Sequence, residues 1–173
     1  LGVLTAEPLE RGFGLTLGNA IRRILLSSLQ GAAITSIKVK GVVHEFSTIQ
    51  GVKEDLTDIL LNLKSVAVKV HSPGLKKMYL KSTGSGELRA GNFETDSETE
   101  IMNPDQLIMT LDSNADIEIE ANVETGKGYV SAEVAEDENK IIGEIKLDAM
   151  FSPVVKTSYK VENSRVGQVT DYD

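Results

Sequence analysis

A glycine-rich turn that runs directly into an amphipathic segment constrains this chain more than any other feature. Residues 9–28 read LERGFGLTLGNAIRRILLSS. With Thr16 as the capping residue, the pattern predicts a helix over about residues 17–29, with Gly31 as its terminator. At about 100° per residue, one side of this helix is apolar. The residues on that side are Leu17, Ala20, Ile21, Ile24 and Leu25.

The opposite side of the predicted helix carries Leu26 between two arginines. Arg22 and Arg23 flank this leucine, and Arg23 and Leu26 are neighbours at i, i+3. Arginine is enriched at interface hot spots, so these three residues are candidates for a docking surface. The alternative is a solvated cationic face with an incidental exposed leucine, which is common on protein surfaces.

The glycines before the helix raise a second hypothesis, a phosphate site. Glycines at a helix start let backbone N–H groups approach a phosphate. A dinucleotide fingerprint that begins at Gly12 needs glycine at position 17, which is Leu17, and no phosphate-loop lysine motif occurs. Turn geometry with a positive φ is the simpler explanation for Gly12, Gly14 and Gly18.

The rest of the chain predicts an α+β fold with antiparallel strands. A second helix is expected at about residues 52–63, since Val52, Leu56, Ile59, Leu60 and Leu63 share one face. Turn signals separate the expected strands. These strands are 3–6, 35–43, 66–71, 78–82, 87–90, 108–111, 116–124, 129–135, 142–147 and 154–161.

Composition excludes several classes of function. The chain has 173 residues, no cysteine and two histidines, so a disulfide framework, a thiolate metal site and a histidine-rich metal site are not expected. A net charge of −8 opposes nucleic-acid binding by this chain as a whole. No apolar run is long enough for a membrane span. We therefore expect a soluble cytoplasmic protein without cofactor or metal.

Other polar residues have ordinary explanations. Asp116, Glu118 and Glu120 alternate along one strand face, which favours a solvated surface over a calcium site. His44 and His71 lack an identifiable catalytic partner. The acidic loop at residues 136–138 is a weak candidate for binding a regulator.

Residues 9–28 closely resemble the first helix region of the bacterial RNA polymerase alpha subunit. Similar blocks follow in the same order at 44–48, 51–55, 60–64, 126–129, 151–154 and 165–173. The resemblance implies an amino-terminal domain that forms a homodimer and scaffolds assembly of the beta and beta-prime subunits. It implies a discontinuous dimerisation domain at 1–30 and 157–173, with a helix on an antiparallel sheet, interrupted by a β-rich insert domain at 31–156. Further strand is expected before residue 1 and a further helix after residue 173.

The resemblance also assigns roles to individual positions. The positions of Arg23 and Leu26, with Arg22 beside them, match the face that meets beta. Lys64 matches a position associated with beta-prime, although a lysine near a helix end is commonly dipole-compatible surface. The candidate dimer contacts are Leu17, Ile21, Ile24 and Leu25.

The same resemblance makes this chain a non-catalytic part of a nucleotidyltransferase. The metal-binding aspartates and the nucleic-acid contacts are then expected in other subunits. Two alternatives remain: a free-standing nucleotide-binding enzyme that uses the glycine-rich turn, and an interaction module unrelated to transcription.

Overall fold

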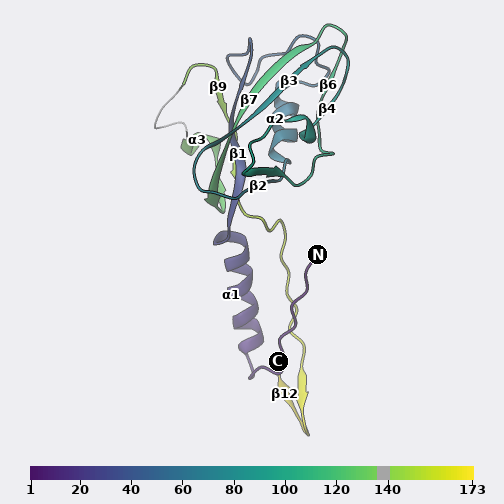
Figure 1. Cartoon of the computed structure of the whole chain (residues 1–173). Helices are drawn as coiled ribbons and strands as arrows, with labels where there is room; N and C mark the ends of the chain where they lie inside the picture. The colour runs from purple at the N-terminus through teal and green to yellow at the C-terminus, as the bar shows by residue number, and fades with distance from the viewer. Residues whose placement is uncertain (136–140) are drawn as a thin grey trace. The chain divides into compact units, whose positions relative to one another are not determined.

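The chain divides into two units in this computed structural model, which describes residues 1–135 and 141–173. The first unit joins Leu1–Leu29 with Val154–Asp173, and the second is Gln30–Pro153. Figure 1 traces the elements of both. Helices combine with antiparallel strands, which confirms the predicted α+β class. The acidic loop 136–138 lies outside the described residues.

The first unit holds one helix and one hairpin. Helix α1 spans Phe13–Ser27, and strand β11 (Ser164–Val166) pairs antiparallel with β12 (Val169–Tyr172). The predictions of strands at residues 3–6 and 154–161 were wrong. Both segments are described throughout, yet neither is paired in a sheet, and an alternating sequence does not form a strand without a partner.

The predicted start of α1 was also wrong. The helix begins at Phe13, and Gly12 occupies the capping position with a left-handed φ of 85°. Thr16 lies inside the first turn, where its hydroxyl donates a hydrogen bond to the Gly12 carbonyl at 3.2 Å. The chain leaves the helix after Ser28 and enters a strand at Gln30, so Gly31 does not terminate the helix.

The second unit is built on one antiparallel sheet with strand order β3-β7-β1-β2-β5, and β9 also pairs with β1. Its strands are β1 (Gln30–Val39), β2 (Val68–Val70), β3 (Lys76–Thr83), β5 (Thr99–Ile101), β7 (Asp116–Lys127) and β9 (Glu144–Lys146). Two smaller pairs are β4 (Gly86–Arg89) with β6 (Leu107–Leu111), and β8 (Tyr129–Val130) with β10 (Ala149–Met150). Short helical turns lie at η1 (Ala90–Asn92) and α3 (Ala132–Ala135).

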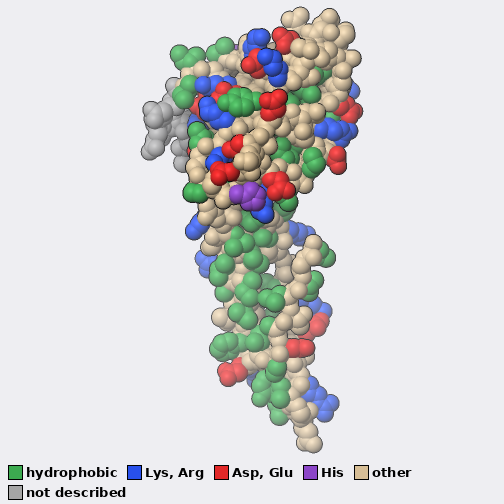
Figure 2. Space-filling view, viewed as in Figure 1, with side chains coloured by type: hydrophobic (Ala, Val, Ile, Leu, Met, Phe, Trp, Pro, Cys, Tyr) green, Lys and Arg blue, Asp and Glu red, His purple; other side chains and the backbone are tan. Residues whose placement is uncertain are grey.

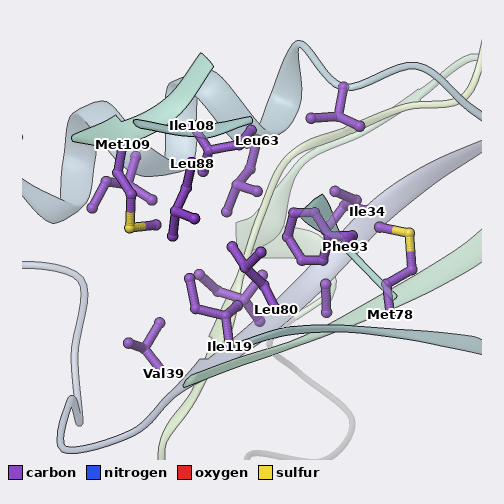
Figure 3. Packing of buried hydrophobic residues seen from close by; sticks show 14 of the residues in the cluster. Ile34, Val39, Leu63, Met78, Leu80, Leu88, Phe93, Ile108, Met109 and Ile119 are labelled. Atoms are coloured by element: carbon purple, nitrogen blue, oxygen red, sulfur yellow. The ribbon is translucent and has the colours of Figure 1, made fainter. Parts of the chain in front are cut away.

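Helix α2 (Leu56–Lys64) covers the core of this second unit. Leu56, Ile59 and Leu63 are buried, as the predicted apolar face requires. Figure 3 shows Leu63 together with Leu88 of β4 facing Leu80 and Ile119 from the sheet. The helix begins later than predicted because Val52 forms an isolated bridge with Leu111 of β6.

Several strand boundaries differ from the predicted ones for reasons of pairing. Strand β1 begins at Gln30 because its ladder with β7 runs from the Gln30–Lys127 pair to the Val39–Ile119 pair. The predicted strand 129–135 stops at Val130. Helix α3 follows at once, and the Ala132 N–H donates to the Asp148 carboxylate at 2.9 Å.

A buried polar cluster ties three strands of the sheet together. The Ser36 hydroxyl of β1 donates to the Glu144 carboxylate of β9 at 2.6 Å. The Asn122 amide of β7 donates to the Ser36 oxygen at 2.9 Å. These bonds fix β9 beside β1 at the point where the β1–β7 register shifts.

Candidate functional site

Helix α1 presents three different faces. Its inner face is half-buried and consists of Gly14, Gly18, Ile21 and Leu25. A second face, which we name the exposed stripe, consists of Phe13, Leu17, Ala20 and Ile24. A third, the arginine face, consists of Leu15, Arg22, Arg23 and Leu26. None of the α1 residues, all of which lie in the described part of the chain, is buried.

The glycines of the inner face allow close packing within the first unit. A Cβ added to Gly18 would lie 2.5 Å from the Tyr159 ring. One added to Gly14 would lie 2.8 Å from Val161 and 2.9 Å from the Cβ of Asp173. The predicted positive φ holds for Gly12, but Gly14 and Gly18 are helical glycines that make room for neighbouring side chains.

The exposed stripe is a line of apolar residues on α1 that stay exposed. Phe13 is 56% exposed, Leu17 37% and Ile24 53%, and they follow one line at i, i+4 and i+11. Hydrophobic side chains gather along α1 in the space-filling view of Figure 2. The apolar side predicted from sequence is therefore divided: Leu17 and Ile24 are exposed, whereas Ile21 and Leu25 lie on the half-buried inner face.

The arginine face differs from its prediction at one residue. Arg22 and Arg23 are exposed as expected, but Leu26 is half-buried. Arg22 precedes Leu26 by one helical turn, so the two residues are neighbours on the helix surface. Leu26 is therefore a partly covered apolar contact within a cationic surface.

The start of α1 is capped by Asp173, a residue that sequence reasoning missed. Its Oδ2 atom accepts hydrogen bonds from the backbone N–H of Gly12 at 2.8 Å and of Gly14 at 3.0 Å. Leu9 and Asp173 also exchange two backbone hydrogen bonds, at 2.7 and 3.0 Å. Local sequence carries no signal for this cap, because 161 positions separate Gly12 from Asp173.

This cap also bears on the phosphate hypothesis. A nucleotide phosphate at the glycine-rich turn needs the N–H groups of Gly12 and Gly14 as donors. In this structure a carboxylate of the same chain already accepts from both. The turn does bind an anion, and that anion is the Asp173 side chain.

A match to a known family decides the class of the protein. A family model described as the RNA polymerase Rpb3/RpoA insert domain matches residues 37–152. The chain belongs to this family. The match covers well over half of the 173 residues and lies within the second unit. The protein is therefore a subunit of the alpha/Rpb3 type, which assembles with other RNA polymerase subunits in a nucleotidyltransferase complex for transcription.

Lys64 lies in this insert domain and has a partner. Its Nζ atom donates to the Asp148 Oδ2 atom at 2.7 Å, and both side chains are half-buried. The hydrogen bond from the Ala132 N–H and the bond from Lys64 lower the pKa of the Asp148 carboxyl. A cavity of about 130 Å³ adjoins the pair, lined also by Leu60 and Leu61. Lys64 is thus an anchored lysine at the end of α2.

The carboxylate row of the insert domain is part of a cross-strand charge ladder. Asp116 pairs with Lys40 at 3.6 Å, Glu118 with Lys81 at 4.0 Å and Glu120 with Lys77 at 2.6 Å. Acidic and basic side chains are interspersed over the surface in Figure 2. Opposite charges on neighbouring strands stabilise a sheet surface, so this row has a structural explanation.

The two histidines are exposed, and each lies beside one polar side chain. The His44 Nδ1 atom lies 3.3 Å from the Ser47 hydroxyl, and the His71 Nε2 atom lies 3.6 Å from a Glu100 oxygen. Within residues 1–135 and 141–173, no group of three or more His, Cys, Asp and Glu side chains is arranged to hold a metal ion. In the same residues, no helix has the length and apolarity needed to cross a bilayer.

Proposed function

We propose that this chain is the amino-terminal assembly domain of a bacterial-type RNA polymerase alpha subunit. In this proposal the first unit is the dimerisation domain, and the chain pairs with a second copy of itself. The dimer then recruits the beta subunit and afterwards beta-prime. The chain acts in the cytoplasm as a scaffold without catalytic residues, while other subunits bind the nucleic acid and perform nucleotidyl transfer.

The exposed stripe of α1 is the observation that supports dimerisation most. A helix whose apolar residues follow one line and remain uncovered lacks the burial that stabilises an amphipathic helix. A two-fold axis supplies that burial by placing the same stripe of a second copy against it. Leu17 and Ile24 are the central contacts in this proposal. Ile21 and Leu25, on the half-buried inner face, are assigned to packing within the protomer.

The arginine face is the proposed contact for beta. Arg23 is exposed, and Leu26 one turn beyond Arg22 offers an apolar anchor beside it. Arginine is enriched at interface hot spots, so Arg23 is the proposed anchor and Leu26 the apolar packing beside it. The arginine face and the exposed stripe lie on different sides of α1, so both contacts are compatible in one assembly.

Lys64 is retained as the proposed contact for beta-prime. Its ammonium group is held by Asp148 beside a small cavity that Leu60 and Leu61 line. A fixed cation next to an apolar recess gives a partner subunit both a charge and a packing site. The pair also limits the entropy that Lys64 loses on binding, because its side chain is already ordered.

The decisive experiment measures capture of purified RNA polymerase beta subunit by the chain. Arg23→Ala and Leu26→Ala are compared with wild type at equal folded fraction. Loss of a true hot spot costs about 2 kcal/mol or more, which is roughly a thirtyfold loss of affinity. Lys156→Ala is the matched control, since it removes an exposed positive charge from the same unit but not from α1.

Each outcome of the capture experiment has a defined meaning. Capture by wild type and by Lys156→Ala, with loss in both α1 variants, supports the scaffold and its docking face. Capture that neither α1 variant affects rejects the arginine face as the beta contact. Absence of capture by wild type rejects the proposed scaffold function.

A further inference from the structure

We infer that Asp173 is a positioning residue for self-association, because it fixes the first turn of α1 and with it the start of the exposed stripe. The inference rests on the proposed function, in which that stripe joins two copies. It assigns a role to a carboxylate far from α1 in the sequence. Asp173 touches the helix backbone, and its effect on the partner passes through Phe13 and Leu17.

The first turn of α1 needs an acceptor that its own residues do not provide. The first N–H groups of any α-helix lack partners within the helix. Here the capping residue is Gly12, which has no side chain, and no acidic residue lies in the first turn. The Thr16 hydroxyl is directed to a carbonyl, that of Gly12, and so does not serve as an acceptor for these N–H groups.

Asp173 supplies that acceptor from a fixed position. One oxygen accepts from both Gly12 and Gly14, at 2.8 and 3.0 Å. The left-handed conformation of Gly12 is the kind that directs successive N–H groups toward one anion. A negative charge here also interacts favourably with the positive end of the helix dipole. Leu9 and Asp173 exchange two backbone hydrogen bonds, so the Asp173 backbone is fixed and its carboxylate stays close to the helix start.

Gly14 and Asp173 form a matched pair. The carboxylate reaches the helix only because Gly14 lacks a Cβ, whose position would lie 2.9 Å from the Asp173 Cβ and 2.8 Å from Val161. The same approach through the missing Cβ of Gly18 brings Tyr159 against the next turn. The inner face of α1 therefore accepts its neighbours by close contact with the helix backbone.

The residue between the two bonded amides is Phe13, at the start of the exposed stripe. Its N–H bonds the Glu10 carbonyl at 2.9 Å, and its side chain is largely exposed. The direction of this side chain is therefore set by the backbone that Asp173 holds. Leu17 follows one turn later on the same line. Arg23 and Leu26 lie in the last turns of α1, beyond the direct reach of the cap.

The test compares self-association of the 173-residue chain with that of four variants by sedimentation. Asp173→Ala removes the acceptor, and we expect the dimer to weaken about tenfold. Asp173→Asn keeps an oxygen acceptor and loses the charge, so its dimer affinity should fall between those of wild type and Asp173→Ala. Asp171→Asn is the matched control, because that exposed carboxylate pairs with Arg11, at 3.4 Å, and does not cap the helix. Leu17→Asp tests the stripe itself.

Amide resonances show whether each variant folds and whether the cap is lost. In Asp173→Ala the Gly12 and Gly14 amide signals should shift while those of the second unit remain. A weaker dimer with those shifts, and partial recovery in Asp173→Asn, supports the inference. If Leu17→Asp disrupts the dimer but Asp173→Ala associates like wild type, the inference is overturned and the proposed function stands. If Leu17→Asp leaves association unchanged, the proposed stripe fails and the inference fails with it.

Discussion

Helices α1 and α2 are both amphipathic, yet they use their apolar residues in opposite ways. The nine residues of α2 bury Leu56, Ile59 and Leu63 in the insert domain. The fifteen residues of α1 bury none. Periodicity predicts that a helix has an apolar face, but it does not say whether the same chain or another one covers that face. The contrast indicates that α2 stabilises the fold, and it agrees with the proposal that α1 binds a partner.

The largest expected effect tests the structural role of α2. Leu63→Ala removes a fully buried side chain and should lower the free energy of unfolding by about 2–5 kcal/mol, through lost burial and a cavity. Chemical denaturation of the insert domain measures this. Leu61→Ala is the matched control on the same helix, since Leu61 is 54% exposed and should change stability by less than about 0.5 kcal/mol. Equal effects of the two would contradict the packing described for α2.

The next effect tests the role of α1 in association. Leu17→Asp places a charge in the exposed stripe and should weaken the dimer at least thirtyfold, about 2 kcal/mol, with little change in the unfolding of the protomer. Leu15→Asp is the control, because Leu15 is 62% exposed on the arginine face. Sedimentation over a range of concentrations distinguishes the two. A dimer lost equally in both variants would show that the stripe has no special part in it.

A smaller effect concerns the close packing of the inner face. Gly18→Ala gains about 1 kcal/mol of helix propensity, but its Cβ must displace the Tyr159 ring, and overpacking costs about 1–3 kcal/mol. We expect a net loss of about 1 kcal/mol in the thermal unfolding of the first unit. Asn19→Ala, at the exposed neighbouring position, should gain stability slightly. An increase for Gly18→Ala would show that Tyr159 moves away without cost.

The smallest effect is the pH dependence of the contact between Lys64 and Asp148. The Ala132 N–H and Lys64 lower the pKa of Asp148 below its ordinary value of 3.8. The carboxylate therefore adds stability above the unfolded-state pKa, and this stability is lost as the pH falls through the lower, folded-state pKa. Because the pair is half exposed, we expect less than about 1 kcal/mol. The measurement is the melting temperature as the pH is lowered. Asp148→Asn should remove the part of its decrease that comes from this carboxylate, whereas Asp105→Asn, at an exposed position, should leave the decrease unchanged.

The sequence predicts the structure correctly where that structure depends on residues close together along the chain. The apolar face of α2, the antiparallel class and the strands around β3, β6 and β7 are confirmed, because each follows from local periodicity and turn signals. The start of α1 was predicted wrongly because Thr16 resembles a cap, whereas the true acceptor is Asp173. Strand β5 and the β11–β12 hairpin were missed, since they are only three or four residues long.

The sequence predicts which residues belong to the candidate site on α1, but not which of its apolar side chains are exposed. The positions of Arg22 and Arg23 on the surface follow from helix periodicity. The division between Leu17 and Ile24 on one side and Ile21 on the other depends on which side of α1 meets residues from the far end of the chain. Gly14 and Gly18 determine that side, and their role becomes visible only beside Val161 and Tyr159.

The bond between Asp173 and Gly12 also sets an order of events during synthesis. A ribosome that adds about 5–20 residues per second needs roughly 8–30 seconds to travel the 161 positions from one partner to the other. For that whole interval the first turn of α1 has been synthesised but lacks its cap, while the insert domain is completed. The proposed self-association through a properly directed stripe would therefore wait until translation has passed the β11–β12 hairpin.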